Sequence, residues 1–445
     1  MACMLLRYIV SNFKSIGHPV EFSMLPAEGD TDERWLKTIS TRAGDWEVLQ
    51  RGGFFGPNAS GKSSFIESVQ FARDFIVNGR RSGRGTGITQ FAGDLKDLNN
   101  LSKFQFTFMV NDNVYDYGFT LDRFQVYEEW LMQMNESGFQ PLFTRTQTSI
   151  GKTEIEVEAG IAPASPQQRN LADILKESIQ KKQQNQLFLN KLSENGIETA
   201  EEVMKWFQNI QVIFPESTYR RFPVYMLEDK EFRTFIKDKL YKLDTGIFDV
   251  SVTSEEFDLH EYAEGSKVFS RIKDELEESQ DGYVPFVGGS FLIKTAEKEK
   301  TVQMQIEFDH KLNGEKGRLK IDQESDGTIR LLDLLPMMYN PRKESYVFFV
   351  DEVDRSLHTK LSQTLLQEFL EYNDGQSQVI FTAHDVNLIN LEHFRQDEIW
   401  FIEKNSHGES MLKPMSDFDV AEGQDTIKAY LAGRFGAVPV IRRDL

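Results

Sequence analysis

Two glycines, a lysine and a serine stand at the spacing of a phosphate-binding loop, in the pattern Gly56-x-x-x-x-Gly61-Lys62-Ser63. In such a loop the backbone N–H groups surround a β-phosphate, the lysine reaches the β- and γ-phosphates, and the serine hydroxyl contacts Mg²⁺. The alternative for these residues is a glycine turn capped by Ser60. The expected nucleotide-binding residues are Gly56, Asn58, Gly61, Lys62, Ser63 and Ser64, with Ser63 also on the metal.

A loop of this kind needs carboxylates from elsewhere in the chain, because Mg²⁺ and an attacking water must both be positioned. Asp351 and Glu352 follow the apolar run 346–350, which is typical of a strand buried on both faces. Active groups of open α/β sheets lie at the carboxyl ends of the strands. We expect Asp351 to orient Mg²⁺ through its water shell and Glu352 to act as the general base. In isolation, an ordinary solvated strand end would be the favoured interpretation of the pair.

Two further segments could place polar groups around a phosphate. Segment 379–389 is another apolar strand that ends in a polar turn, where His384 could contact a γ-phosphate. A helical pattern separates it from the first strand, and a strand–helix–strand unit brings both strand ends side by side. In 322–335, Ser325 and Gly327 begin an apolar-periodic helix, which gives a second helix N-terminus able to bind phosphate.

The elements flanking the loop fit a strand–loop–helix unit. A short strand is predicted from Val48, Leu49, Phe54 and Phe55, and a helix from Phe65, Val69, Ala72 and Ile76. The N-terminus of that helix, with its partial positive charge, would face the anion. Segment 103–122 alternates apolar residues about Asn111-Asp112-Asn113 and predicts a hairpin.

Composition sets broad limits on the class of protein. The 445 residues, 40% hydrophobic and 27% charged, suffice for one large core or two ordinary ones. No run approaches the ~18 apolar residues of a spanning helix, and the start lacks the basic segment and cleavage site of a signal peptide, so we expect a cytoplasmic protein without a membrane partner. The single cysteine, Cys3, excludes an intramolecular disulfide.

The net charge of −19 argues against a surface that coats DNA. A local exception is the glycine-rich segment 78–85, where Arg80, Arg81 and Arg84 could meet phosphate or form a solvated turn. DNA binding therefore stays open.

These motifs, in this order and with a long insertion, resemble an ABC-type ATPase head of the SMC/RecF kind. The start of the chain is similar to that group's first strand, with Asn12-Phe13-Lys14-Ser15 matching its N-F-K/R-S motif. The tail 428–441 resembles a narrower prokaryotic group, the ATPases of anti-phage and abortive-infection systems, which includes the AriA subunit of PARIS and relatives in Septu and OLD/Gabija systems.

The resemblance implies an α/β fold: an ABC-type P-loop ATPase head, with a mixed sheet, flanking helices and an antiparallel side sheet. The apolar spacing after residue 165 adds a mostly helical insertion, helical up to about residue 210 and mixed beyond. The expected domains are 1–160 and 301–445 for the two halves of the head, and 161–300 for the insertion. Thr199 and Glu202 are a possible capping box within the insertion. The insertion lacks sustained heptads, so we expect a short lever without the long coiled coil of SMC proteins.

The resemblance also implies ATP and Mg²⁺ as cofactors and adds two site residues, Asn12 at the nucleotide and Gln90 at the γ-phosphate and metal. The segment Glu324-Ser325-Asp326-Gly327-Thr328 stands where the family has Leu-Ser-Gly-Gly-Gln. Two heads would hold ATP between the P-loop of one and Ser325-Gly327 of the other. Binding would close the pair, and hydrolysis would reopen it.

By analogy with this family, the main hypothesis is a defence ATPase that forms a homo-oligomeric scaffold, responds to a phage-encoded trigger and holds or releases an effector such as a nuclease. One alternative is a RecF-like, ATP-gated DNA-repair clamp. Another is a nucleotide-dependent assembly module without enzymatic activity.

Overall fold

The structure is a computed structural model that describes residues 3–29, 32–79, 85–93, 99–148, 152–161, 166–182, 184–215, 222–258, 267–279, 282–294, 301–312, 315–339, 344–373, 375–420 and 423–438. The chain forms two compact units. The first comprises Met1–Phe214, Pro341–Asp354 and Asn373–Leu445, and the second comprises Pro215–Asn340 and Arg355–Tyr372. Arg80, Arg81 and Arg84 lie outside the described residues.

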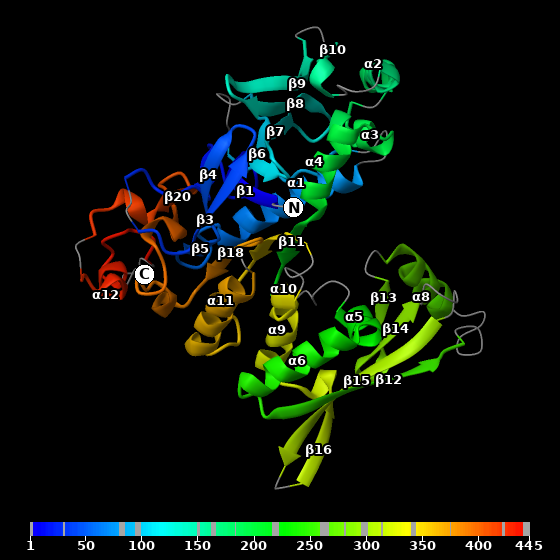
Figure 1. The fold of residues 1–445 in the computed structure, drawn as a ribbon, viewed down its shortest axis with the longest axis vertical. Coiled ribbons are helices and arrows are strands. Elements are labelled where there is room, and N and C mark those ends of the chain that lie inside the picture. Colours follow the sequence, from blue (N-terminus) through cyan, green and yellow to red (C-terminus); the bar gives the residue numbers. More distant parts are fainter. Residues whose placement is uncertain are drawn as a thin grey trace. The chain divides into compact units, whose positions relative to one another are not determined.

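A mainly parallel sheet carries the predicted site in the first unit (Figure 1). Its strands, in spatial order, are β11 (Ile210–Ile213), β17 (Val347–Val350), β18 (Gln378–Ala383), β5 (Arg51–Phe55), β19 (Ile399–Lys404) and β20 (Ser410–Pro414). Only β20 pairs antiparallel. Every residue of β17 and β18 is buried, and Val350 pairs with Phe381. The prediction that these two strands end side by side is confirmed.

An antiparallel sheet forms the other layer of the first unit. Its strands, in spatial order, are β10 (Thr153–Val157), β9 (Gly138–Gln147), β8 (Val126–Asn135), β7 (Asn113–Leu121), β6 (Ser102–Val110), β1 (Cys3–Ser11) and β2 (Val20–Ser23). The hairpin predicted over 103–122 is β6 and β7, and Asn111 supplies its turn with φ of 54°. A separate hairpin, β3 (Leu36–Thr41) and β4 (Gly44–Leu49), precedes β5.

Helix α1 (Lys62–Asn78) packs between these two sheets. The predicted apolar face is confirmed, because Phe65, Val69, Ala72 and Ile76 are all buried. The ring of Phe65 lies 4.7 Å from that of Phe54 in β5 and 5.5 Å from that of Tyr8 in β1. Both sheets therefore fix the helix whose N-terminus follows the P-loop.

The other helices of the first unit are α2 (Pro166–Lys182), α3 (Phe188–Glu194), α4 (Glu198–Gln208) and α12 (Thr426–Leu431). The capping box predicted from Thr199 and Glu202 is wrong. Helix α4 has its N-cap two residues earlier, at Ile197, and Glu202 accepts hydrogen bonds from Asn111 in the β6–β7 turn and from Tyr115 of β7. The Glu202 carboxylate therefore makes a tertiary contact instead of the hydrogen bond to the N-cap backbone that a capping box requires.

The compact units divide the chain at different positions from the predicted domains 1–160, 161–300 and 301–445. Segment 161–214 belongs to the first unit, because β11 extends the parallel sheet and Trp206 of α4 stacks 4.1 Å from Phe108 of β6. Segment 301–340 belongs to the second unit, because its first strand pairs with strands that precede it in that unit.

The second unit combines an antiparallel sheet with helices. Its strands are β12 (Ile247–Glu256), β15 (Thr301–Leu312), β14 (Ser290–Lys294) and β13 (Tyr283–Phe286) in spatial order, with β16 (Glu315–Lys320) paired to β15. Its helices are α5 (Phe222–Glu228), α6 (Lys230–Lys242), α8 (Lys267–Glu278), α9 (Asp326–Leu334), α10 (Pro336–Tyr339) and α11 (Thr359–Asn373). Beyond residue 246 the predicted insertion contains the strands β12, β13 and β14 together with helix α8, so it is mixed there. Met304, Ile306 and Phe308 are buried at every second position, which is the period of a strand.

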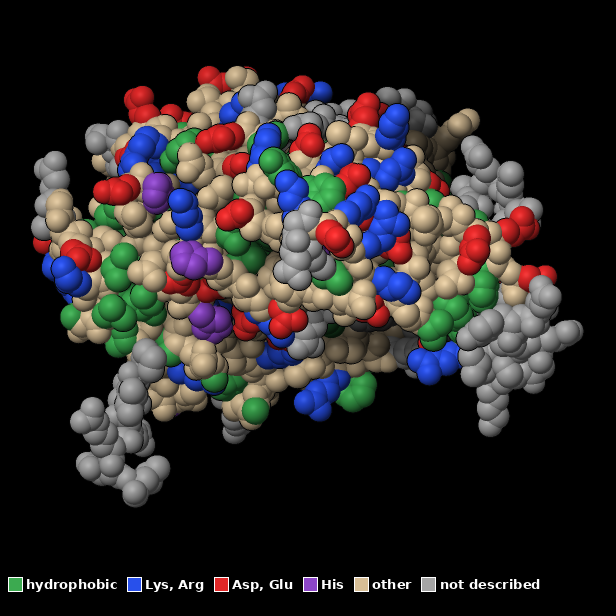
Figure 2. All heavy atoms as spheres, turned by 90° about the horizontal axis from the view of Figure 1, so that it is seen from below, with side chains coloured by type: hydrophobic (Ala, Val, Ile, Leu, Met, Phe, Trp, Pro, Cys, Tyr) green, Lys and Arg blue, Asp and Glu red, His purple; other side chains and the backbone are tan. Residues whose placement is uncertain are grey.

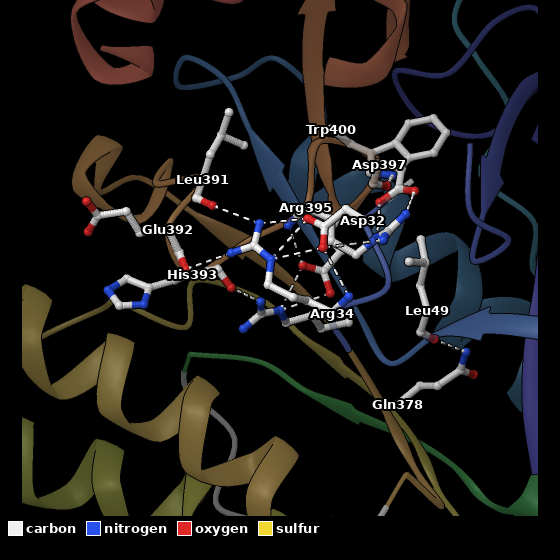
Figure 3. A network of polar contacts seen from close by, with 12 residues as sticks. Asp32, Arg34, Leu49, Gln378, Leu391, Glu392, His393, Arg395, Asp397 and Trp400 are labelled. Atoms are coloured by element: carbon white, nitrogen blue, oxygen red, sulfur yellow. Dashed lines mark hydrogen bonds and ion pairs between the residues drawn. The ribbon is translucent and has the colours of Figure 1, made fainter. Parts of the chain in front are cut away.

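A buried network of charged side chains holds β5 against the segment before β19. Arg51, the first residue of β5, donates from Nε to both carboxylate oxygens of Glu398 at 3.0 Å. Arg395 donates to Asp397 at 2.7 and 2.9 Å, and it lies 3.9 Å from Asp32 (Figure 3). The Arg51 and Glu398 side chains are at most 2% exposed. Pairing makes their burial tolerable, because each ion would otherwise lose its solvation without compensation.

This network predicts a pH-dependent stability. Burial raises the pKa of Glu398 from 4.5 to about 7, although the charge of Arg51 opposes the rise. The folded state then binds this proton more tightly than the unfolded chain, so the contribution of Glu398 to stability is full below about pH 4.5 and declines as pH rises to about 7. The parent should lose this contribution as pH rises from 5 to 8, whereas Glu398→Gln should not. The difference in unfolding free energy between the two proteins should therefore shift in favour of the variant by up to about 3 kcal/mol over this range.

Urea unfolding of both proteins at each pH measures this difference. Glu128→Gln, at an exposed position of β8, controls for the loss of one carboxylate. A constant difference between parent and Glu398→Gln over the pH range would contradict the prediction.

Among the helices of the described residues, none is both long and apolar enough to cross a membrane.

Candidate functional site

The P-loop connects β5 to α1 in a conformation that depends on glycine. Gly61 is the N-cap residue of α1, with φ of 113°, and no side chain caps the helix. A Cβ on Gly61 would collide with Ser410 Oγ, and one on Gly56 would collide with the Ile402 carbonyl oxygen. Ser410 Oγ also donates to the Ser60 carbonyl at 2.7 Å. Strands β19 and β20 therefore support the loop from behind and tolerate no side chain at either glycine.

Lys62 lies folded over its own loop. Its Nζ donates to the carbonyl oxygens of Gly56 at 2.7 Å and Pro57 at 3.1 Å, and the residue is 5% exposed. Burial lowers the pKa of Lys62, while the negative charges of Asp351, Asp354 and Glu352 oppose the decrease. The ammonium group thus faces the carboxylates that the sequence analysis assigned to the same site.

A cavity of about 760 Å³ opens in front of the P-loop. It brings the loop together with the ends of β17, β18 and β19. The lining residues are Ser15, Asn58, Ala59, Ser60, Gly61, Lys62, Ser63, Ser64, Glu352, His384 and Lys404. Residues more than 300 positions apart in sequence therefore form one concave surface around the lysine.

Asp351 and Glu352 follow β17 in two different environments. Asp351 is 4% exposed, and its Oδ1 accepts a hydrogen bond from Thr382 Oγ1 at 2.6 Å. Glu352 adopts φ of 49°, in the left-handed region, and its side chain is 31% exposed. Its Oε1 lies 3.5 Å from His384 Nε2. The buried carboxylate suits a fixed role at a metal shell, and the more exposed one can meet a water molecule.

Asp354 links the two loops that carry the acidic residues and the histidine. Its Oδ2 accepts hydrogen bonds from the backbone N–H groups of His384 at 2.8 Å and Asp385 at 2.5 Å. The turn after β18 is thereby attached to the turn after β17. A movement of the turn that carries Glu352 and Asp354 would therefore also move His384.

Comparison with known families decides the class of the chain. Residues 53–390 match the family described as "AAA domain, putative AbiEii toxin, Type IV TA system". The chain belongs to this family. The matched residues include the P-loop, both carboxylates and His384. A search of curated proteins gave no match.

Solved structures that resemble the chain include SMC heads. The SMC head domain from Thermotoga maritima has a TM-score of 0.37 and 13% identity, over 94% of this chain and 99% of that one. An SmcHead bound to the C-winged helix domain of ScpA has a TM-score of 0.38 and 11% identity, over 92% and 97%. The Smc head with an extended coiled coil bound to the C-terminal domain of ScpA, derived from Pyrococcus furiosus, has a TM-score of 0.36 and 11% identity, over 97% and 100%.

Ser325 and Gly327 lie in the second compact unit of the chain. The helix predicted over 322–335 is α9, and Ser325 is its N-cap, accepting a hydrogen bond at Oγ from the Thr328 N–H at 3.1 Å. A Cβ on Gly327 would lie 2.9 Å from the Ser356 carbonyl oxygen. Ser325 is exposed at the start of this helix.

Asn12 and Gln90 are not among the residues that line the cavity. Asn12 is 2% exposed in a turn with φ of 52°, and its Oδ1 accepts the Phe91 N–H at 3.0 Å. Gln90 donates from Nε2 to the Asn100 carbonyl at 2.5 Å. In the described residues Asn12 therefore connects the first strand to segment 85–93, a structural role that differs from the nucleotide contact we expected.

Sequence reasoning assigned no role to four further residues of this site. Ser15 and Lys404 line the cavity, Ser410 supports Gly61, and Thr382 binds Asp351. Ser15 ends the Asn12-Phe13-Lys14-Ser15 motif and was thus within reach. The other three depend on which strands are neighbours, and no local pattern reveals that.

Proposed function

We propose that this chain is an ATP-binding and ATP-hydrolysing subunit of a prokaryotic anti-phage defence system, in which it holds and releases a toxic effector, most simply a nuclease. The cavity in which Lys62, Glu352 and His384 meet carries the enzymatic part of the proposal. The family description supports the biological part, because it names a toxin of a type IV toxin–antitoxin system. The resemblance of the tail to AriA points the same way, and we place the protein in the cytoplasm.

The residues present fit ATP and Mg²⁺. Gly56 and Gly61 let the loop backbone lie directly against Ile402 and Ser410, and the Ser60 Oγ is buried without a hydrogen-bond partner in the structure. Among the described residues, no cluster of three or more His, Cys, Asp or Glu side chains forms a metal site. Mg²⁺ is commonly held by one or two carboxylates together with substrate phosphates, which suits Ser63 and Asp351. The metal, when bound, would neutralise charge on the phosphates.

The remaining steps belong to the side chains of the cavity. Lys62 exchanges the carbonyls of Gly56 and Pro57 for phosphate oxygens. Glu352 accepts the proton of the attacking water, and His384 contacts the terminal phosphate beside it. We also propose that Gln90 contributes at the γ-phosphate and the metal.

We further propose that two copies act together, so that ATP binds between the P-loop of one copy and Ser325-Gly327 of the other. An exposed helix N-terminus with a serine and a glycine is suited to a phosphate. A symmetric pair would contain two such composite sites. ATP would then favour the closed pair by contacts that only that state provides, and hydrolysis would remove them.

The charge distribution favours a protein effector over DNA. On the face drawn in Figure 2, lysine and arginine side chains are interspersed with aspartate and glutamate, and the chain carries a net charge of −19. A protein that tracks a phosphate backbone usually presents a basic stripe. We therefore keep an ATP-gated DNA clamp as the second candidate function.

Affinity purification tests the proposal. The tagged protein, expressed with its neighbouring genes, should retain a stoichiometric protein partner at moderate salt with ATP, and mass spectrometry identifies it. Glu352→Gln should change the amount of partner that co-purifies with the tagged protein. If that amount is the same with and without ATP and in the variant, the result would argue against a nucleotide-controlled switch. Recovery of DNA instead, with binding that falls steeply with salt, would replace the defence proposal by the clamp.

A further inference from the structure

We infer that the Thr382 hydroxyl is the positioning group that holds both acidic residues of the site in working geometry. The inference deepens the proposed function and rests on it, because Asp351 and Glu352 act on metal and water only if the chain turns over ATP. Thr382 itself lies outside the cavity lining, so its effect passes through these two residues.

Thr382 binds three consecutive residues after β17. It is fully buried near the end of β18. Its Oγ1 donates to Asp351 Oδ1 at 2.6 Å and accepts the Glu352 N–H at 2.8 Å. Its carbonyl oxygen accepts the Val353 N–H at 2.9 Å.

The chemistry of these groups fixes the direction of each bond. An ionised carboxylate only accepts and a backbone N–H only donates, while a hydroxyl has one proton to donate and lone pairs to accept. The Thr382 hydroxyl is therefore used in both directions at once. Its proton fixes the rotation of the Asp351 carboxylate, and its lone pair fixes the peptide that leads into Glu352.

The second of these bonds matters because the Glu352 backbone is strained. Its φ of 49° lies in a region that residues with a Cβ rarely adopt. Such a conformation persists only where its surroundings impose it. The Thr382 bond to the Glu352 N–H is one of these constraints, and without it the Glu352 side chain could turn away from His384, 3.5 Å distant.

Replacing the hydroxyl by a methyl group tests the inference. Thr382→Val keeps the shape but removes both bonds, and Thr382→Ser keeps the hydroxyl. For Thr382→Val we expect kcat to fall about 10- to 100-fold, as is typical when a group that orients metal ligands is lost. The KM for ATP should change by less than about threefold, because the P-loop is untouched. Thr382→Ser should restore kcat to within a few-fold of the parent.

A second readout avoids turnover altogether. Electron paramagnetic resonance measures Mn²⁺ binding to the protein saturated with a non-hydrolysable ATP analogue, and Thr382→Val should weaken it about tenfold or more. Thr107→Val is the matched control, because Thr107 is a buried threonine of the antiparallel sheet that donates to Asp116 at 2.8 Å. It should leave both kcat and Mn²⁺ affinity unchanged. If Thr382→Val does not fold, Thr382→Ala removes the same hydroxyl without adding a methyl group.

The outcomes separate this inference from the proposed function. If the parent hydrolyses ATP, and Thr382→Val matches it in both kcat and Mn²⁺ affinity, the inference is overturned and the ATPase stands. If the parent shows no turnover, the proposed function fails, and an unchanged Mn²⁺ affinity in Thr382→Val would overturn the inference as well. An equal loss in Thr107→Val would show a general effect of threonine removal and would also overturn it.

Discussion

Glu352→Gln is expected to abolish ATP turnover while leaving ATP binding intact. The amide has the size of the carboxylate but cannot accept the proton of the attacking water, and loss of a general base lowers kcat by about 10²- to 10⁴-fold. The hydrogen bond from Thr382 to the Glu352 N–H involves only the backbone, so the left-handed conformation should persist. Steady-state phosphate release and binding of a fluorescent ATP analogue measure the two properties.

The matched control is Glu67→Gln on α1. Glu67 is a partly exposed carboxylate that pairs with Lys14 at 2.6 Å, and it does not line the cavity. This variant should hydrolyse ATP at the parental rate. Size-exclusion chromatography with ATP should show Glu352→Gln in a larger species than the parent, because the closed pair can no longer be reopened by hydrolysis. Parental turnover in Glu352→Gln would assign the base to another residue.

Two inactive variants, Lys62→Ala and Ser325→Asp, should regain activity when they are mixed. Lys62→Ala loses the buried ammonium that faces the phosphates, which should weaken ATP binding by about 10- to 100-fold. Aspartate at position 325 is as good an N-cap as serine, so α9 should remain intact, but its charge repels a phosphate. If the sites are composite, a mixed pair contains one intact site, and random exchange of subunits should restore about a quarter of the parental rate.

A second mixture controls for this experiment. Lys62 and Glu352 lie in one cavity of one copy, so Lys62→Ala with Glu352→Gln leaves no complete site in a mixed pair and should stay inactive. Circular dichroism checks that each variant is folded. Failure of Lys62→Ala with Ser325→Asp to recover, or equal recovery in the control mixture, would contradict a site shared between two copies.

The comparison of sequence and structure shows which features local patterns can reveal. The P-loop, β17 and β18 were predictable, because a strand buried on both faces is an unbroken apolar run and the loop has a fixed spacing. In the second unit, Gln303 and Gln305 alternate with the buried Met304 and Ile306, which is the period of a strand, so β15 was also open to prediction. No local sequence pattern indicates the role of Thr382, because its hydrogen bonds depend on the parallel register that sets Val350 beside Phe381. The interpretation of Asn12 rested on a motif alone, and the structure gives this residue a contact to Phe91.

The position of β5 in its sheet has a consequence for the synthesis of the protein. Its hydrogen-bonded neighbours are β18 and β19, which begin at Gln378 and Ile399. A nascent chain that has emerged only as far as the second unit therefore carries the complete P-loop sequence on a strand without either partner. Pairing over such sequence separations is slow, and unpaired apolar strands are prone to aggregation. The ability to bind ATP should thus arise only after β18 and β19 have been synthesised, and a chain terminated before β18 would be incapable of it.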